Sequence, residues 1–157
     1  MAAYHYEPEG RDLFTMKVCD IMSDRVLWVG QDVPVSAAAK LMKRSNIGAV
    51  PVCDGQNRLR GMLTDRDIVT RCVAAELDPG TVPVSEIMSR GVVTVSPFDE
   101  VEHAAKTMST DQVRRLPVLD GGKLVGMVTL CDMARNCNCD MEAGEALTEI
   151  SSNFRRR

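Results

Sequence analysis

The chain has 157 residues, of which 45% are hydrophobic, so it is long enough to bury a sizeable core in one compact unit or two small ones. Its formal net charge is -3, from 19 basic and 22 acidic residues, and only 4% of its residues are aromatic. Without a broad positive field or stacking platforms, we expect binding to neither duplex nor single-stranded nucleic acid.

The segment Met1 to Phe14 is polar and acidic, and no window reaches the roughly 18 apolar residues of a membrane-spanning helix. We therefore predict neither an export signal nor a membrane anchor, and a cytoplasmic location. The six cysteines are then expected to be reduced thiols. Four lie in apolar periodic segments and are predicted to be small core residues: Cys19, Cys53, Cys72 and Cys131.

After a poorly patterned arm, the sequence repeats itself. Ile21-Met22-Ser23 returns as Ile87-Met88-Ser89, an offset of 66 residues. After the Asp-Gly pair of each copy the offset falls to 65, and a predicted turn is where such a deletion is tolerated. Further matching pairs are Val35 and Val101, Pro51 and Pro117, Asp54 and Asp120, Gly61 and Gly126, Thr64 and Thr129, and Asp67 and Asp132.

Both copies have the same predicted order of elements when read by hydrophobic period. In the first copy, strands are predicted over 26–29, 49–53 and 59–63, with helices over 33–45 and 65–77. In the second copy, strands are predicted over 92–95, 115–119 and 123–128, with helices over 99–111 and 130–137. Pro34 suits a first helical turn, and Asp-Gly turns join the last two strands of each copy into a hairpin.

This order predicts an α/β (α+β) fold of two β-α-β-β-α repeats. A single repeat would leave one face of its small sheet uncovered, so we expect the two to pack through their sheets with pseudo-twofold symmetry. The predicted parts are an N-terminal arm over 1–16, a first repeat over 17–78, a second repeat over 79–138, and a C-terminal helix with a basic tail over 139–157.

In each copy a strand runs into a Thr that is followed three residues later by an Asp. The strings are G-M-L-T-D-R-D, which contains Thr64 and Asp67, and G-M-V-T-L-C-D, which contains Thr129 and Asp132. One interpretation is helix capping, because Thr is a good N-cap and an acid suits the first turn of a helix. The other is a ligand site at the helix start, with a hydroxyl and a carboxylate that hold a ribose.

Over residues 17–138 the two copies resemble a pair of CBS domains, the arrangement called a Bateman module. The resemblance rests on the Ile-Met-Ser openings, the Asp-Gly turns, the two Thr-Asp strings, and Ala49-Val50-Pro51-Val52 against Arg115-Leu116-Pro117-Val118. It implies clefts between the repeats that take AMP, ADP, ATP, NAD or S-adenosylmethionine, with the Thr and Asp of each string on the ribose. A regulatory sensor is therefore expected, with AMP or ATP favoured, and the family commonly forms dimers.

By the same resemblance, each cleft is built by both repeats. The cleft at Thr64 is then faced by Arg114 and Arg115, with Arg66 at its own helix start, and guanidinium groups suit phosphate oxygens. The cleft at Thr129 is faced by uncharged residues, so we predict unequal sites; a solvated arginine face is the alternative. The predicted nucleotide-binding residues are Ile47, Ala49, Val50, Thr64, Arg66, Asp67, Val93, Arg114, Arg115, Leu116, Thr129 and Asp132.

The predicted helix over 65–77 has more apolar residues than one sheet face needs: Ile68, Val69, Cys72, Val73, Ala75 and Leu77. This surplus predicts self-association, for which a twofold dimer is the usual closed arrangement. Whether the chain also binds a different protein is left open.

Two other hypotheses remain. Clefts that stay empty would make the chain a dimeric scaffold or interaction module. Cys137 and Cys139 could instead serve a thiol- or metal-responsive function, although structural zinc usually needs four ligands and no second pair has that spacing. The two histidines, His5 and His103, have no visible nucleophile partner and no Gly-rich phosphate loop occurs, so we predict no catalytic residues and no resident metal.

Overall fold

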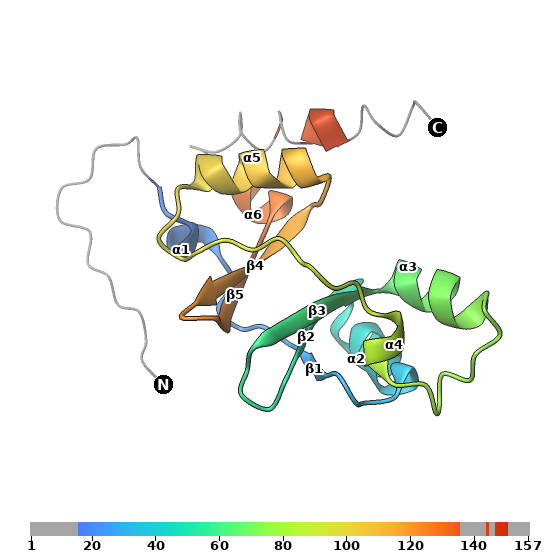
Figure 1. The fold of residues 1–157 in the computed structure, drawn as a ribbon. Coiled ribbons are helices and arrows are strands. Elements are labelled where there is room, and N and C mark those ends of the chain that lie inside the picture. Colours follow the sequence, from blue (N-terminus) through green and yellow to red (C-terminus); the bar gives the residue numbers. More distant parts are fainter. Residues whose placement is uncertain (1–15, 136–143, 145–146, 151–157) are drawn as a thin grey trace.

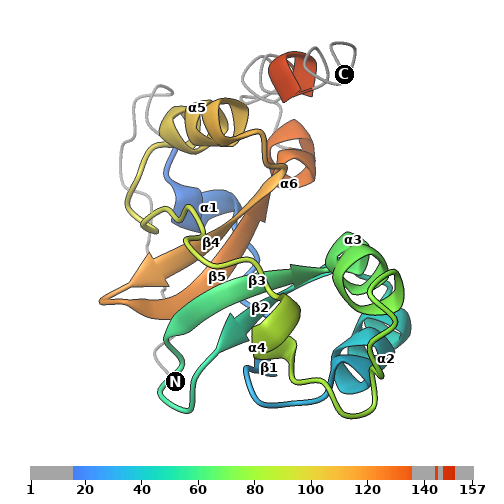
Figure 2. The same cartoon turned by 45° about the vertical axis from the view of Figure 1, so that its right-hand side comes forward.

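The computed structural model describes residues 16–135, 144 and 147–150, and it has two halves, each with a small sheet and helices (Figures 1 and 2). In the first half, β2 (Ala49–Cys53) lies between a parallel β1 (Val29–Gly30) and an antiparallel β3 (Leu59–Thr64). In the second half, β4 (Arg115–Asp120) and β5 (Lys123–Thr129) form an antiparallel pair. The predicted mixed α+β class is confirmed.

The longest helices of the described chain, α2 (Val35–Ser45) and α5 (Val101–Asp111), occupy the same place in the two halves. Each buries an apolar stripe and ends at a residue in the left-handed conformation, Asn46 and Gln112. Both begin two residues later than predicted, because the backbone just before each helix is still extended; Pro34 therefore lies at the N-cap position and not in the first turn.

The predicted strand over 92–95 is reduced to one parallel bridge between Val95 and Val118. The amide of Val95 donates to the carbonyl of Pro117 at 3.1 Å, and the amide of Leu119 donates to the carbonyl of Val95 at 2.9 Å. Pro97 follows and has no N–H, so the ladder cannot continue there. The corresponding strand of the first copy is also shorter than the predicted 26–29, because β1 contains only Val29 and Gly30.

The helix predicted over 65–77 is shorter and has two parts. The α-helical turn α3 (Asp65–Asp67) continues into a π-helical segment, η1 (Ile68–Val73). A π-helix is rare in proteins and occurs mostly as a short segment. Glu76 then takes a positive φ of 56° and the chain turns away. The corresponding helix of the second half is α6 (Leu130–Arg135); its predicted continuation to residue 137 lies outside the described residues.

Two short helices were not predicted from the sequence, and each of them packs on the other half of the molecule. In α1 (Val18–Ile21), both end residues belong to the core cluster of the second half. In α4 (Val84–Ile87), both end residues belong to the core cluster of the first half. Figures 1 and 2 show this exchange, with α1 beside β4 and β5 and α4 beside β2 and β3. The two cores are therefore built from exchanged segments.

The exchange follows the predicted pseudo-twofold relation. Ser23, after α1, exchanges two backbone hydrogen bonds with Met127 of β5 at 2.9 and 3.0 Å. Ser89, after α4, exchanges two with Met62 of β3 at 2.9 and 2.8 Å. The two serines occupy matching positions, each at the end of an Ile-Met-Ser string. The sheet of each half therefore gains a backbone partner from the start of the other copy.

The two Asp-Gly turns close their hairpins differently. Asp54 accepts backbone hydrogen bonds from Gln56 at 2.9 Å and from Arg58 at 3.0 Å, and the Arg58 bond is the main cause of its lowered pKa. The second turn is a tight one, in which Gly121 and Gly122 both have positive φ, as a two-residue hairpin turn requires. The one-residue difference between the copies therefore falls in the predicted turn.

The ends of the chain are only partly described. The arm before residue 16, and residues 136–143, 145–146 and 151–157, lie outside the described residues. Within the predicted C-terminal helix, residues 147–150 are helical, and Ile150 packs against the core of the second half. No helix in the described residues has the length and apolar character to cross a membrane.

Candidate functional site

A cavity of about 430 Å³ lies between the two halves, within the size range of small-molecule sites. Four segments line it: the start of β2, the end of β3 with α3, the segment after α4, and the start of β4 with the residues before it. Both halves therefore contribute to its wall. The predicted site residues that line it are Ala49, Thr64, Arg66, Asp67, Val93, Arg114 and Arg115.

The remaining predicted residues lie elsewhere. Val50 and Leu116 are fully buried in the cores of the two halves, and Ile47 packs against the core of the first half. Each of these apolar residues is explained by packing, and none lines the cavity. Thr129 and Asp132 lie at the start of α6, the position in the second half that corresponds to Thr64 and Asp67.

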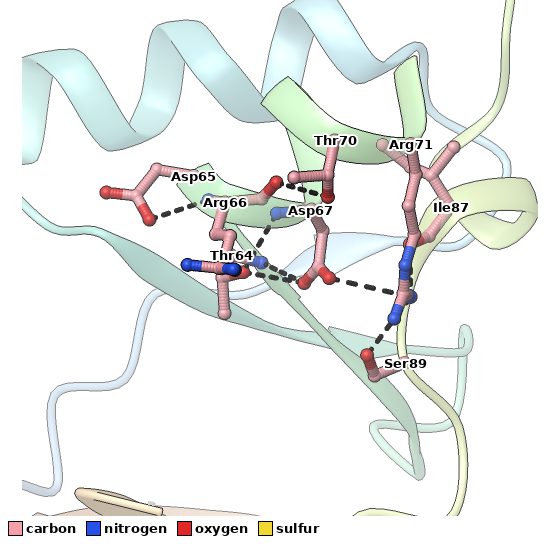
Figure 3. Close-up of polar contacts among 8 residues, drawn as sticks. All are labelled: Thr64, Asp65, Arg66, Asp67, Thr70, Arg71, Ile87 and Ser89. Carbon is pink, nitrogen blue, oxygen red and sulfur yellow. Dashed lines mark hydrogen bonds and ion pairs between the residues drawn. The ribbon is translucent and has the colours of Figure 1, made fainter. Parts of the chain in front are cut away.

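Asp67 lies inward, at the cavity wall, in a capping box with Thr64 (Figure 3). Its Oδ2 atom accepts from the Thr64 amide at 2.9 Å and from the Thr64 hydroxyl at 2.7 Å, and the Asp67 amide donates back to the Thr64 hydroxyl at 3.1 Å. The capping interpretation is therefore realised. It fixes the carboxylate at the wall, so capping and ligand binding are compatible here.

The second carboxylate oxygen of Asp67 has a different environment. Its Oδ1 atom accepts no hydrogen bond from any described residue, and it lies 3.5 Å from Nη1 of Arg71. The Asp67 side chain is only 12% exposed. A carboxylate oxygen of this kind is a strong acceptor for hydroxyl groups of a ligand.

The charged groups of the cavity wall are predominantly basic. Four arginines, Arg66, Arg90, Arg114 and Arg115, stand against two aspartates, so the wall attracts anions. Within the described part of the chain, the guanidinium groups of Arg66, Arg114 and Arg115 take part in no ion pair. They are therefore available for phosphate oxygens, whose geometry suits their paired N–H groups.

Arg90 was missed in the sequence analysis, together with other lining residues of the segment after α4. Its Nη2 atom donates to the Ser85 carbonyl at 3.0 Å. The sequence does mark this segment, because it follows the second Ile-Met-Ser opening. In the structure, the bridge between Ser89 and Met62 brings it to the first half. The lining residues missed are Met62, Asp65, Ser89, Arg90, Gly91 and Val92.

The corresponding position in the second half has the same local geometry with different charges. Asp132 accepts from the amide and the hydroxyl of Thr129 at 2.9 and 2.6 Å. The next two residues are a buried Leu130 and an exposed Cys131, where the first half has Asp65 and Arg66. Asp24 stands where the second copy has Arg90. The two positions therefore differ in charge, and unequal binding at the two sites stays a prediction.

Among the residues that the structure describes, no group of three or more His, Cys, Asp and Glu side chains has a metal-binding arrangement. Cys137, Cys139 and His5 lie outside the described residues, so the thiol or metal hypothesis stays a prediction.

The structure is a pair of similar halves with a cavity between them. The family model of the CBS domain matches residues 18–74 and 84–138. The chain therefore belongs to the CBS domain family and is a CBS domain pair, as the sequence predicts.

Two curated relatives span most of the chain. The CBS domain-containing protein YhcV of Bacillus subtilis is 46% identical over 134 residues, which cover 85% of this chain and 94% of YhcV. Hypoxic response protein 1 of Mycobacterium tuberculosis is 42% identical over 117 residues, which cover 74% of this chain and 82% of that protein.

Two solved structures extend this comparison. The crystal structure of Hypoxic response protein 1, with two coordinated zinc ions, has a TM-score of 0.73 and 40% identity and covers 77% of this chain and 98% of that one. The CBS domain pair of protein MJ0100, in complex with 5'-methylthioadenosine and S-adenosyl-L-methionine, has a TM-score of 0.69 and 30% identity. It covers 77% of this chain and 94% of that one.

Proposed function

We propose that this CBS domain pair is a cytoplasmic regulatory module that binds an adenosyl ligand, with AMP or ATP favoured, in the cavity between its halves. The observation that carries the proposal is the inward carboxylate of Asp67, whose Oδ1 atom is without a hydrogen-bond donor from the described residues. A ribose diol offers two hydroxyl donors to such an oxygen, and charge-assisted hydrogen bonds of this kind are the stronger ones.

The rest of the wall fits the other parts of a nucleotide. Arg66, Arg90, Arg114 and Arg115 supply positive charge for phosphate groups. Val92, Val93 and Val113 supply apolar surface for adenine. The complex of the MJ0100 domain pair with two adenosyl compounds supports the ligand class. The arginines are our reason for favouring phosphorylated adenosine over these uncharged or cationic adenosyl groups.

Isothermal titration tests this proposal with AMP, ADP, ATP, NAD and S-adenosylmethionine, each with and without EDTA because a relative's crystal structure contains zinc. We expect one preferred phosphorylated ligand. Asp67→Asn should abolish its measurable binding, whereas Asp132→Asn, at the second position, which has Leu130 and Cys131 in place of Asp65 and Arg66, should change that affinity less than about threefold. No binding heat and no melting shift with any of the five ligands would refute the proposal and favour the scaffold hypothesis.

We also propose that the module forms a homodimer through the surface of η1. Val69 and Val73 on η1 are 58% and 61% exposed, and Leu77 beyond it is 38% exposed. Apolar side chains gathered on one helical surface mark an association site more often than scattered ones do. This surface realises the apolar surplus predicted for the segment, while Cys72 on its opposite side is buried.

A further inference from the structure

Arg71 on η1 contacts three groups that come from two different segments (Figure 3). Its Nη1 atom donates to the Ile87 carbonyl at 3.0 Å and to the Ser89 hydroxyl at 3.1 Å. The same atom lies 3.5 Å from Oδ1 of Asp67. Arg71 itself does not line the cavity, but Asp67 and Ser89 both do. It therefore links two neighbouring residues of the cavity wall that come from different segments.

The number of hydrogens on Nη1 decides the nature of these contacts. A guanidinium Nη atom carries two hydrogens, and the bonds to Ile87 and Ser89 use both of them. The contact with Asp67 is thus an attraction between charges, without a shared hydrogen. Oδ1 faces the positive charge of Arg71, while its lone pairs stay open to a ligand.

Arg71 also orients the hydroxyl of Ser89, by donating a hydrogen bond to its oxygen. Because its oxygen accepts from Arg71, its own hydrogen is left to donate to another group, and Ser89 lies on the cavity wall. One guanidinium therefore prepares an acceptor at Asp67 and a donor at Ser89. This pair matches a vicinal diol, each hydroxyl of which both donates and accepts hydrogen bonds.

We propose that Arg71 is a positioning residue that makes the cavity selective for the ribose diol. This inference rests on the proposed function, since it assigns the recognition of one part of the adenosyl ligand. Because Ser89 and Ile87 belong to the segment that crosses between the halves, binding and the docking of that segment are coupled. By reciprocity, a ligand that uses this geometry strengthens the Arg71 contact as much as the contact strengthens binding.

The test compares AMP with 2',3'-dideoxy-AMP, which lacks both hydroxyls, in titrations of the full chain. We expect the preference for AMP to fall about fivefold to tenfold in Arg71→Gln, which keeps a hydrogen-bond donor and removes the charge. Arg71→Lys, which keeps the charge, should retain the preference within about threefold. The matched control is Arg44→Gln, at an exposed arginine in the last turn of α2, and it should change neither affinity.

A second variant keeps the test decisive if Arg71→Gln does not fold. Ser89→Ala frees one Nη1 hydrogen to turn onto Oδ1, so it should also lower the preference for AMP. An equal loss for both nucleotides would show that Arg71 acts only on stability and would overturn the inference, as would an unchanged preference in either variant that folds. Absence of AMP binding to the unsubstituted chain would instead overturn the proposed function, and the inference with it.

Discussion

A Cβ atom built on Gly61 would lie 2.6 Å from the backbone carbonyl oxygen of Ser89, closer than real Cβ atoms come to such an oxygen. Gly61 is the first residue of the string that holds Thr64 and Asp67, and Ser89 belongs to the segment that crosses from the other half. The glycine is therefore required by the close approach of two backbones, and the cavity depends on this approach because Ser89 lines it.

We expect Gly61→Ala to lower the free energy of unfolding by about 2 to 4 kcal/mol, since backbone must move to make room. At the corresponding Gly126, the nearest group is the flexible Met22 side chain at 2.5 Å, and the backbone oxygen of Ser23 is farther away at 3.2 Å. Gly126→Ala should therefore cost less.

Chemical denaturation of the two variants measures this difference. Gly55→Ala is the matched control, because nothing lies within 4 Å of its added Cβ atom. Equal losses at Gly61 and Gly126 would contradict the proposed difference between backbone and side-chain crowding.

Thr64→Ala should cost about 1 kcal/mol of stability, because it removes an N-cap and a hydrogen bond to the Asp67 carboxylate. Thr129→Ala removes the same two contacts at the start of α6 and should cost about as much. Only Thr64→Ala should also weaken AMP binding. Thermal unfolding and titration of both variants check the two parts separately, and an equal effect of both on AMP affinity would argue against a single preferred cavity.

The arginines should contribute in proportion to the phosphate charge of the ligand. Arg114→Ala together with Arg115→Ala should weaken ATP binding by about tenfold or more and adenosine binding by less than about threefold. Arg90→Ala should follow the same order. Added salt should weaken ATP binding in the unsubstituted chain more than in the double variant. Titrations at two salt concentrations measure this, and equal losses for ATP and adenosine would assign these arginines a structural role.

Self-association should depend on the exposed apolar surface of η1. Val69→Lys together with Val73→Lys should shift the protein from dimer to monomer, because burying two charged side chains in an interface is costly. The control is Phe98→Lys, which changes an equally exposed apolar residue, 60% accessible, outside η1. Sedimentation velocity distinguishes the species. A dimer that persists in the η1 variant and is lost in the control would place the interface elsewhere.

Cys53 should make stability depend on pH in the alkaline range. Burial, with a smaller contribution from the charge of Asp54, raises the pKa of its thiol to about 11 from 9.0. A group whose pKa is raised by folding contributes stability that is fully present below its unfolded pKa and is lost as pH rises toward the folded one. We therefore expect unfolding to become easier between about pH 9 and pH 11.

Urea denaturation across this range, on the unsubstituted chain and on Cys53→Ala, isolates this thiol from other groups that titrate there. The variant should be less stable at pH 8, because it loses buried side-chain volume, and the difference between the two proteins should narrow as pH rises. A difference that stays constant from pH 8 to pH 11 would contradict the assignment.

The sequence predicts those parts of the fold whose causes are local. The bounds of β2 were predicted residue for residue, because five apolar residues lie between a helix stop and an Asp-Gly turn. The internal offset located the Thr and Asp of both halves, and their capping geometry follows from residue types three positions apart. The predicted strand over 92–95 is reduced to a single bridge at Val95, and Pro97, which has no N–H, prevents the pairing from extending past it.

The membership of the two cores was decided only by tertiary structure. Val18 and Val84 begin four-residue helices that have no periodic signal of their own, and each docks on a half that its position in the chain does not indicate. The same docking brings Ser89 and Arg90 to the cavity and gives Arg71 its partners at Ile87 and Ser89. The sequence by itself determined the repeat, its elements and the carboxylate of the site. The groups around that carboxylate come from segments far apart in the chain, and only packing brings them together.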